Sequence, residues 1–429
     1  MSRSTQHPSR RSPLLRQQVR GSALAALGLT TCVALAAGAM TSASASGEAA
    51  AAQGPPTRTV TTWGASDDMA GGQLTDTTVR NVVHTSIGGT NLRVRLSNAK
   101  GDRPLVLDSV WVGTSAGGPA VVAGTNTRLT FNGSTTATIP PGAVVLSDPL
   151  RGEVAPQQTL AVSIHVSGTS GPLTAHNRTM QQTWSGTTRG DFAADESGAV
   201  LDDQSATWWW LDGILLDAPV QTQSVATLGD SITAGVGTTI DANRRWPDVL
   251  ADRLAELPET RQMGVVNEGI SGNRVLSGVS KPGSAGDAAL SRLERDVLTK
   301  PGVDTVLLLE GVNDIGAGSS AAEIVDGYRM LVSRAHAAGR CVVGGTILPF
   351  GGSVYVDPEG EKVRVEVNEF IRTSGVFDGV VDFARATADP ANPSRLRAEF
   401  FGDGLHPNDA GNKAMGEAVD LDVLRCDRR

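Results

Sequence analysis

Three side chains in the sequence have the types and settings needed for nucleophilic attack on a carbonyl carbon. Ser231 follows the apolar run 225–228 within the sequence Gly-Asp-Ser-Ile-Thr. Far along the chain, Asp403 and His406 stand three residues apart in Asp-Gly-Leu-His-Pro. At this spacing the carboxylate can accept a hydrogen bond from one ring nitrogen, which leaves the other nitrogen to remove a serine proton. These residue types predict a serine nucleophile with a histidine base.

Each of these residues also has an ordinary structural explanation. A serine at a helix start is commonly the residue that caps the helix, and His406 could equally cap the helix that follows it. A serine at a strand-to-helix turn, however, would expose its hydroxyl at the sheet edge. Its own N–H would lie in the field of the helix N-terminus, which favours a developing anion. Only the combination of the two segments points to catalysis.

Two segments between Ser231 and Asp403 could donate hydrogen bonds to an anion that develops beside the serine. Residues 267–273 (Asn-Glu-Gly-Ile-Ser-Gly-Asn) follow the second β-rich run, and residues 311–314 (Gly-Val-Asn-Asp) follow the third. The backbone N–H at Gly272 and the side-chain amide of Asn313 are the donor types that an oxyanion hole needs. We therefore expect both segments to border the same site.

The elements that must position these residues are β-rich runs that alternate with amphipathic segments. The five runs are residues 225–228, 265–267, 303–309, 341–347 and 380–383. The apolar positions of two intervening segments, spaced as on one face of a helix, are Leu290, Leu293 and Val297, and Ile324, Tyr328, Leu331 and Ala335. A final helix is expected after Pro407, since proline suits the first helical position. Strands separated by helices imply a parallel sheet covered on both faces, with the site beyond the carboxyl ends of its strands.

The residues before this region follow a different period. Between about 59 and 217 apolar and polar residues alternate, as Leu92, Val94 and Leu96 do with Arg93 and Arg95. Such strands, broken by Gly-Gly, Asn-Gly and Pro-Pro turns, predict an antiparallel β-sandwich. The predicted organisation is a signal peptide at 1–45, a linker at 46–58, an all-β domain at 59–220 and an α/β domain at 221–429.

Two groups of residues in the all-β half have competing interpretations. His84, His165 and His176 could be imagined as a metal set, but their spacing fits no standard ligand pattern, so we interpret them as scattered strand histidines. Neither these residues nor the rest of the sequence predicts a metal site. The run 208–210 of three tryptophans is either a sugar-stacking platform or packing at the domain junction, and we favour packing.

Composition and charge restrict the class of protein. Hydrophobic residues make up 40% of the 429 residues and charged residues 19%, which excludes a disordered or multi-spanning membrane protein. The formal charge is −8, and removing the five arginines of the acid-free first 45 residues leaves −13. Nucleic acid is therefore not an expected partner, because binding it requires Lys and Arg to neutralise phosphates.

The first 45 residues have the order of an export signal. A basic stretch from Arg10 to Arg20 precedes an apolar stretch at 21–40, and Ala43-Ser-Ala45 offers a small-x-small cleavage site. The apolar stretch is rich in weakly hydrophobic Ala, Gly and Thr, which favours cleavage over a retained membrane anchor. We therefore expect a secreted protein without stable membrane insertion. In an oxidising compartment Cys341 and Cys426 could form a disulfide, and two buried thiols are the alternative.

Taken together, the four segments resemble those of the SGNH subgroup of GDSL-type esterases and acylhydrolases. GDSIT, with Ile where the family has Leu, matches the first block, and NEGISGN, GVND and DGLHP match the others in order and placement. The resemblance implies a flavodoxin-like three-layer α/β/α fold with a five-stranded parallel sheet, and hydrolysis of carboxylic esters without a cofactor. It implies that Ser231 is the nucleophile, His406 the general base and Asp403 its orienting partner. The implied oxyanion hole consists of the Ser231 and Gly272 N–H groups and the Asn313 amide.

A second resemblance concerns the substrate. The segments TVRNVVHTSIGGTNLRVRLSN, RRWPDVLADRL and HPNDAGNKAM are similar to those of a group of secreted two-domain GDSL proteins, often linked to removal of O-acyl groups from polysaccharides. The expected substrate is a small-molecule or polysaccharide ester with a short acyl group. Two alternatives stay open, namely a lipase or phospholipase acting on longer acyl chains, and a glycan-binding surface protein with a vestigial hydrolase. Structural roles are assigned to Asp230, Glu310 and Asp314.

Overall fold

The computed structural model describes residues 56–278, 285–353 and 358–425. Residues 54–429 form one compact unit. The predicted signal peptide, most of the predicted linker and Cys426 lie outside the described residues, so the signal and the Cys341–Cys426 pairing stay predictions. None of the helices described is long and apolar enough to span a membrane.

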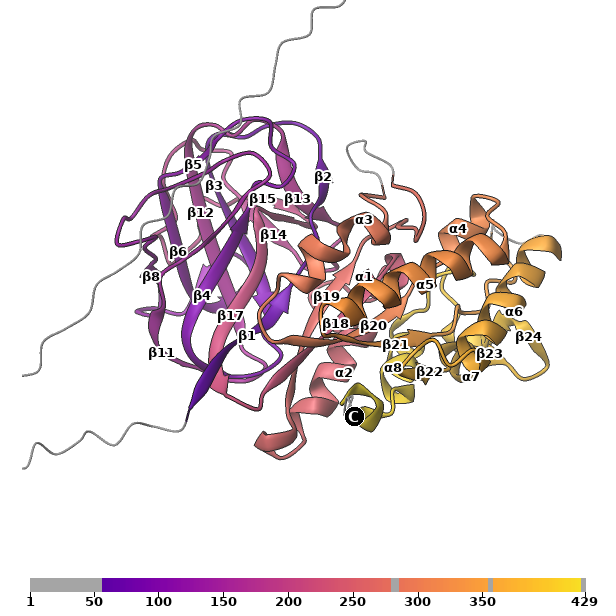
Figure 1. Ribbon diagram of the computed structural model, residues 1–429. Coiled ribbons are helices and arrows are strands. Elements are labelled where there is room, and N and C mark those ends of the chain that lie inside the picture. Colours follow the sequence, from indigo (N-terminus) through magenta and orange to yellow (C-terminus); the bar gives the residue numbers. More distant parts are fainter. Residues whose placement is uncertain (1–55, 279–284, 354–357, 426–429) are drawn as a thin grey trace, which may run out of the picture. The chain divides into compact units, whose positions relative to one another are not determined.

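The N-terminal part is built from antiparallel strands, as the period-two pattern predicts (Figure 1). One sheet has the order β1 (Thr57–Gly64), β17 (Leu211–Pro219), β4 (Gly89–Ser97) and β10 (Val144–Leu146), with β11 (Leu150–Val154) also paired to β4. The other has the order β15 (Asp203–Ser205), β14 (Thr183–Ser185), β3 (Thr75–His84), β12 (Thr159–Thr169), β6 (Ser109–Gly117) and β7 (Ala120–Val121), with β8 (Thr127–Arg128) on β6.

Smaller pairings complete this part. They are β16 (Thr207–Trp209), β13 (Leu173–Asn177) and β2 (Asp68–Ala70) in one sheet, and β5 (Leu105–Leu107) with β9 (Ala137–Ile139) in another. Its core holds the inward residues of both large sheets, among them Val94, Leu96, Val162 and Ile164. Strand β1 begins at Thr57, inside the segment predicted as linker.

The C-terminal part contains the predicted parallel sheet of five strands. Their order is β19 (Met263–Gly269), β18 (Gln223–Gly229), β20 (Val303–Leu309), β21 (Cys341–Gly345) and β22 (Gly379–Val381). β18 is buried along nearly its whole length, as expected for a strand covered on both faces. The prediction of a three-layer α/β domain is confirmed.

Helices cover both faces of this sheet (Figure 1). Those that pack together on one face are α3 (Ala289–Leu293), α5 (Ala321–Ala337) and α6 (Pro358–Thr373), and those on the other are α2 (Trp246–Ala255), α7 (Phe383–Thr387) and α8 (Asp409–Ala418). The predicted apolar face of α5 is buried, and Ser320 and Glu323 form a capping box at its start. The final helix begins after Pro407, as predicted, but Asn408 caps it, so Pro407 precedes the cap.

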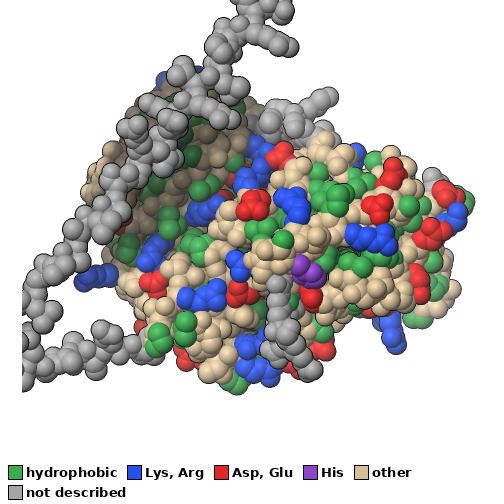
Figure 2. Space-filling model, viewed as in Figure 1, with side chains coloured by type: hydrophobic (Ala, Val, Ile, Leu, Met, Phe, Trp, Pro, Cys, Tyr) green, Lys and Arg blue, Asp and Glu red, His purple; other side chains and the backbone are tan. Residues whose placement is uncertain are grey.

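The polar face of one antiparallel sheet is buried instead of solvated. Arg95 of β4 is 7% exposed, forms an ion pair with Asp212 of β17 at 2.9 Å and donates to Thr299 Oγ1 of the C-terminal part at 3.3 Å. Near by, Ser224 Oγ of β18 donates to the carbonyl of Thr61 in β1 at 2.7 Å. This contact of β1, β4 and β17 with the C-terminal part is called the junction below. On the face seen in Figure 2, acidic and basic side chains are intermixed.

Candidate active site

The nucleophile candidate lies where β18, an inner strand of the parallel sheet, ends. β18 ends at Gly229, and α1 (Ser231–Ala234) begins two residues later. Asp230 caps this helix, because its Oδ1 accepts the N–H of Ile232 at 2.8 Å. Ser231 is therefore not the cap, and its hydroxyl is left for another partner. Its side chain is less accessible than the sequence suggested, since Ser231 is only 3% exposed.

That partner is the predicted histidine. Ser231 Oγ lies 2.8 Å from Nε2 of His406, and Nδ1 of His406 lies 2.7 Å from Oδ2 of Asp403. The other oxygen of Asp403 accepts the backbone N–H groups of His406 at 2.8 Å and Leu405 at 3.0 Å. The structure thus brings together three side chains that the sequence separates by up to 175 positions.

The electrostatics of Asp403 determine the state of the imidazole. Partial burial alone would raise the pKa of Asp403, but the hydrogen bonds from the His406 backbone and ring and from the Leu405 N–H lower it to about 2. The carboxylate is therefore ionised at neutral pH and accepts a hydrogen bond from the N–H at Nδ1 of His406. Nε2 then carries the lone pair that faces the serine hydroxyl.

Two loops that flank the candidate base are tied to each other. The loop after α1 passes so close to His406 that a Cβ on Gly237 would lie 3.4 Å from the His406 Cβ, and Gly237 has φ +99°. Asp409, in the first turn of α8, accepts the N–H of Thr239 at 2.7 Å and pairs with Arg244 at 2.9 Å. The segment that follows the serine is therefore fastened to the helix that follows the histidine.

The two predicted donor segments also meet. Gly272 follows β19 in a left-handed conformation with φ +80°, and Asn313 lies in α4 (Val312–Gly316), just after β20. The Asn313 side chain is 5% exposed, and its Nδ2 donates to the carbonyl of Asn273 at 2.9 Å. This bond fixes the plane of the amide next to the Gly272 loop.

Three carboxylates beside the motifs are buried. Asp314 accepts the N–H groups of Val275 at 2.8 Å and Leu276 at 3.1 Å, and so supports the loop that carries Gly272. Burial raises the pKa of Asp230 to about 7, with Asp314 adding to the effect, and burial and the Asp230 charge raise that of Glu310. Asp230 and Asp314 accept hydrogen bonds from backbone N–H groups, as expected of residues with structural roles.

Sequence reasoning missed Arg292, which lies beneath the candidate site. The side chain is fully buried and donates to Asn273, to Ser66 and to two strand-end carbonyls, those of Gly229 and Glu268. The pattern Leu290, Leu293, Val297 identified the apolar face of its segment and left Arg292 off that face. Nothing in the sequence pattern distinguishes it from an exposed arginine.

The histidines considered as a metal set have separate partners. His84 lies 2.9 Å from Thr159 Oγ1, His165 lies 3.2 Å from Asp76, and Nδ1 of His176 lies 2.8 Å from the Ser66 carbonyl. Within the described ranges no group of three His, Cys, Asp or Glu side chains is placed to hold a metal ion.

The tryptophan run is used for packing. Trp208 and Trp210 are buried, and Trp208 makes an edge contact with Trp63 at 4.8 Å between centroids. The guanidinium of Arg245, from the C-terminal part, lies 5.8 Å from the Trp208 ring centroid. Trp208 therefore packs between the two parts, as expected for packing at the domain junction.

In comparison with known proteins, the C-terminal part matches one family model. Residues 227–414 match the GDSL-like lipase/acylhydrolase family, a range that contains all five predicted site residues. A search of curated proteins found no match.

Solved structures that resemble the chain cover a little under half of it. An aryl esterase from M. smegmatis is 20% identical over 46% of this chain and 95% of its own, with a TM-score of 0.36. A lipolytic protein of the G-D-S-L family from Veillonella parvula is 20% identical over 46% and 95%, with a TM-score of 0.35. A carbohydrate acetylesterase family member from Sinorhizobium meliloti is 18% identical over 46% and 94%, with a TM-score of 0.36.

Proposed function

We propose that the C-terminal part, whose residues 227–414 match the GDSL-like lipase/acylhydrolase family, hydrolyses carboxylic esters through Ser231, His406 and Asp403. The observation that carries the proposal is the continuous hydrogen-bonded series from Ser231 Oγ to His406 Nε2 and from His406 Nδ1 to Asp403 Oδ2. Nucleophile, base and orienting group are thereby within the reach that proton transfer requires.

In the first half of the reaction, Ser231 Oγ attacks the ester carbonyl carbon while Nε2 of His406 takes the hydroxyl proton. The ionised Asp403 stabilises the imidazolium that results. The tetrahedral intermediate collapses when the bond to the alkoxy oxygen breaks, and His406 gives its proton to that oxygen. An alcohol leaves, and the acyl group stays on Ser231. Water then repeats the sequence, with His406 as its base, and releases the acid and the free serine.

The charge that develops on the carbonyl oxygen needs donors beside Ser231. We assign this part to the N–H groups of Ser231 and Gly272 and to the Asn313 amide, because the Asn313 side chain is bonded to the residue that follows Gly272. Such donors are already oriented before the reaction, so they stabilise the anion without reorganisation.

The test is Ser231→Ala, assayed on a short-chain chromogenic ester. Activity should fall by several orders of magnitude, because the acyl acceptor is lost and only the residual effect of binding and of the oxyanion donors is left. Ser333→Ala, an exposed serine of α5, is the matched control and should keep wild-type activity. Full activity in Ser231→Ala would refute the assignment.

The proposed substrates are short-chain O-acyl esters, including acyl groups on polysaccharides. The support is the low aromatic content of 4% and the resemblance to the secreted two-domain group. Longer acyl chains are the second candidate, since Ile240 and Phe401, 50% and 38% exposed, lie on the loops that flank His406. A series from acetate to palmitate decides between them, and a maximum at long chains would favour the second.

We further propose that the protein is secreted. The support is the basic, apolar and small-residue order of residues 1–45. Mature protein from the medium of an exporting host should begin at Ser46. A membrane-bound product that retains residues 1–45 would contradict this.

A further inference from the structure

A buried arginine links the nucleophile strand to the loop that carries Gly272. Arg292 of α3 is fully buried, and its Nη2 donates to the carbonyl of Gly229, two residues before Ser231, at 2.9 Å. Its Nε donates to Oδ1 of Asn273 at 2.9 Å. One rigid guanidinium thus connects the end of β18 with the residue that adjoins Gly272.

Asn273 passes this restraint on to the second donor. Its Nδ2 donates to the carbonyls of Ala285 at 2.6 Å and Asp287 at 2.8 Å, so its side chain is bonded at both ends. Its own carbonyl accepts the Asn313 amide at 2.9 Å. A displacement of Asn273 would therefore move both the Gly272 loop and the Asn313 side chain.

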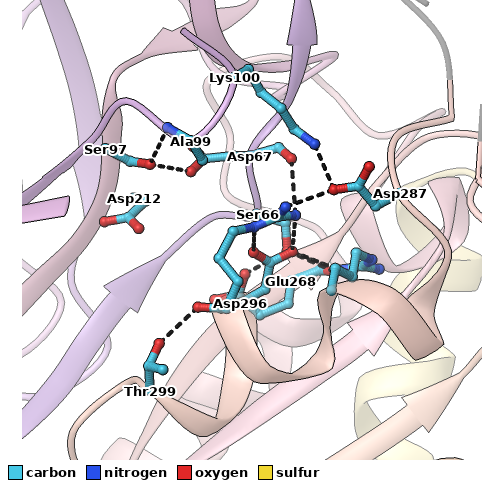
Figure 3. A network of polar contacts seen from close by, with 12 residues as sticks. Ser66, Asp67, Ser97, Ala99, Lys100, Asp212, Glu268, Asp287, Asp296 and Thr299 are labelled. Atoms are coloured by element: carbon cyan, nitrogen blue, oxygen red, sulfur yellow. Dashed lines mark hydrogen bonds and ion pairs between the residues drawn. The ribbon is translucent and has the colours of Figure 1, made fainter. Parts of the chain in front are cut away.

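The guanidinium also forms ion pairs with the buried carboxylates of Asp296 at 3.5 Å and Glu310 at 3.6 Å. One further hydrogen bond reaches the N-terminal part. Nη1 of Arg292 donates to the carbonyl of Glu268 and to Oγ of Ser66, each at 2.8 Å. Ser66 lies between β1 and β2, and its hydroxyl donates in turn to Oε2 of Glu268 at 2.6 Å. Figure 3 shows Ser66 and Glu268 within a cluster of polar side chains at the junction.

The same cluster satisfies Lys300, another buried cation of the C-terminal part. Its Nζ pairs with Oε1 of Glu268 at 2.6 Å and donates to the carbonyl of Asp212, in β17, at 2.6 Å. Burial raises the pKa of Glu268 to about 7, and Lys300 and Ser66 oppose the rise. Buried polar groups of the catalytic part thus depend on atoms of the N-terminal part for their hydrogen bonds.

We propose that Arg292 is a positioning residue for the oxyanion-binding loop, and that Ser66 of the N-terminal part completes the hydrogen bonds that hold Arg292 in place. The N-terminal part is then a component of the active site, and not an independent module. This inference rests on the proposed function, because the effect is expected in the stabilisation of a tetrahedral anion.

The test compares two buried serines of the junction in the full-length protein. Ser66→Ala removes the hydroxyl that bonds Arg292. Ser224→Ala removes a hydroxyl of equal burial that also crosses the junction, to the Thr61 carbonyl, at the opposite end of β18. Both variants should lower the unfolding temperature by similar amounts. A difference in activity between them therefore reports the positioning of Arg292 and not the stability of the protein.

Ser66→Ala should lower kcat about 5- to 20-fold with KM nearly unchanged, a fraction of the 100- to 1000-fold loss typical of removing a whole donor. The inhibition constant for a trifluoromethyl ketone, which forms a tetrahedral adduct with the serine, should rise by the same factor. Ser224→Ala should keep kcat and this constant within twofold of wild type. Arg292→Lys, which keeps the charge but not the geometry, should lose more activity than Ser66→Ala if it folds.

Equal kcat values for the two serine variants, or a change in KM alone, would overturn the inference. Its failure is distinguishable from failure of the proposed function. A wild-type protein without esterase activity overturns both, whereas activity that Ser231→Ala abolishes and Ser66→Ala leaves intact overturns only this one.

Discussion

Replacing Asp403 with asparagine should reverse one hydrogen bond and leave the shape of the site intact. Two backbone N–H groups, those of Leu405 and His406, donate to Oδ1 at 3.0 and 2.8 Å. In Asp403→Asn only the amide oxygen can accept both, so the NH2 group must occupy the position of Oδ2, 2.7 Å from Nδ1 of His406. The ring would then accept at Nδ1 and carry its proton on Nε2. That nitrogen could no longer take the proton of Ser231.

The size of the loss follows from the missing base. A wrong tautomer in a serine protease triad costs about 10⁴-fold in kcat. Asp403 has a side-chain exposure of 63%, so solvent can assist tautomer exchange. We therefore expect a smaller loss, about 10³-fold or ~4 kcal/mol of transition-state stabilisation. Asp403→Ala leaves the ring free to adopt the productive tautomer, and its loss should be about 10²-fold.

The assay is steady-state hydrolysis of a short-chain chromogenic ester near pH 7.5, with circular dichroism to confirm that both variants fold. The ordering is the decisive result, because the alanine variant removes more atoms yet should be the more active. If the kcat of Asp403→Asn equals or exceeds that of Asp403→Ala, the tautomer argument and the role given to Asp403 are refuted.

Two further predictions concern the donor set and the junction. Asn313→Ala should lower kcat about 100- to 1000-fold with little change in KM, measured by steady-state kinetics, and a change confined to KM would assign the amide to substrate binding instead. Burial and the neighbouring Asp212 raise the pKa of Asp67 from 3.8 to about 7. The folded protein therefore binds the proton of the Asp67 carboxyl group more tightly than the unfolded chain does. Its stability should fall as pH rises from about 4 to about 7. Asp67→Asn removes this pH dependence, so the Tm of the variant minus that of wild type should increase between pH 5 and pH 8. A Tm difference that stays constant over this range would contradict a buried, protonated Asp67.

The strands of the parallel sheet and the three candidate triad residues were predictable from the sequence because each leaves a local pattern. A strand covered on both faces contains a nearly continuous apolar run, which identifies β18 and β20. Parallel strands end at a common edge, so residues that follow them meet there however far apart they are in sequence. The short spacing of Asp403 and His406 fixes their contact within one loop.

The other features of the site depend on which elements pack against each other in the folded protein. The periodicity of a segment does not contain that information. Arg95 and Arg292 lie at positions where the pattern of their own segments predicts solvent, and both are buried. Arg95 bonds Thr299 of the other part of the chain, and Arg292 bonds groups distant in sequence, among them the Gly229 carbonyl. The capping of α1 by Asp230 instead of Ser231 was likewise ambiguous, since both residue types cap helices. For both arginines a long-range neighbour decided the outcome.

If Ser231 and His406 react as proposed, their order along the chain has a consequence for the timing of activity. The serine emerges early in synthesis of the C-terminal part, and the imidazole that must activate it comes from the loop before the last long helix, α8. A nascent or C-terminally shortened polypeptide therefore possesses a hydroxyl without a base and is chemically inert. Under the proposed mechanism, turnover begins only once α8 has packed against the rest of the domain, so activity would indicate that folding is complete.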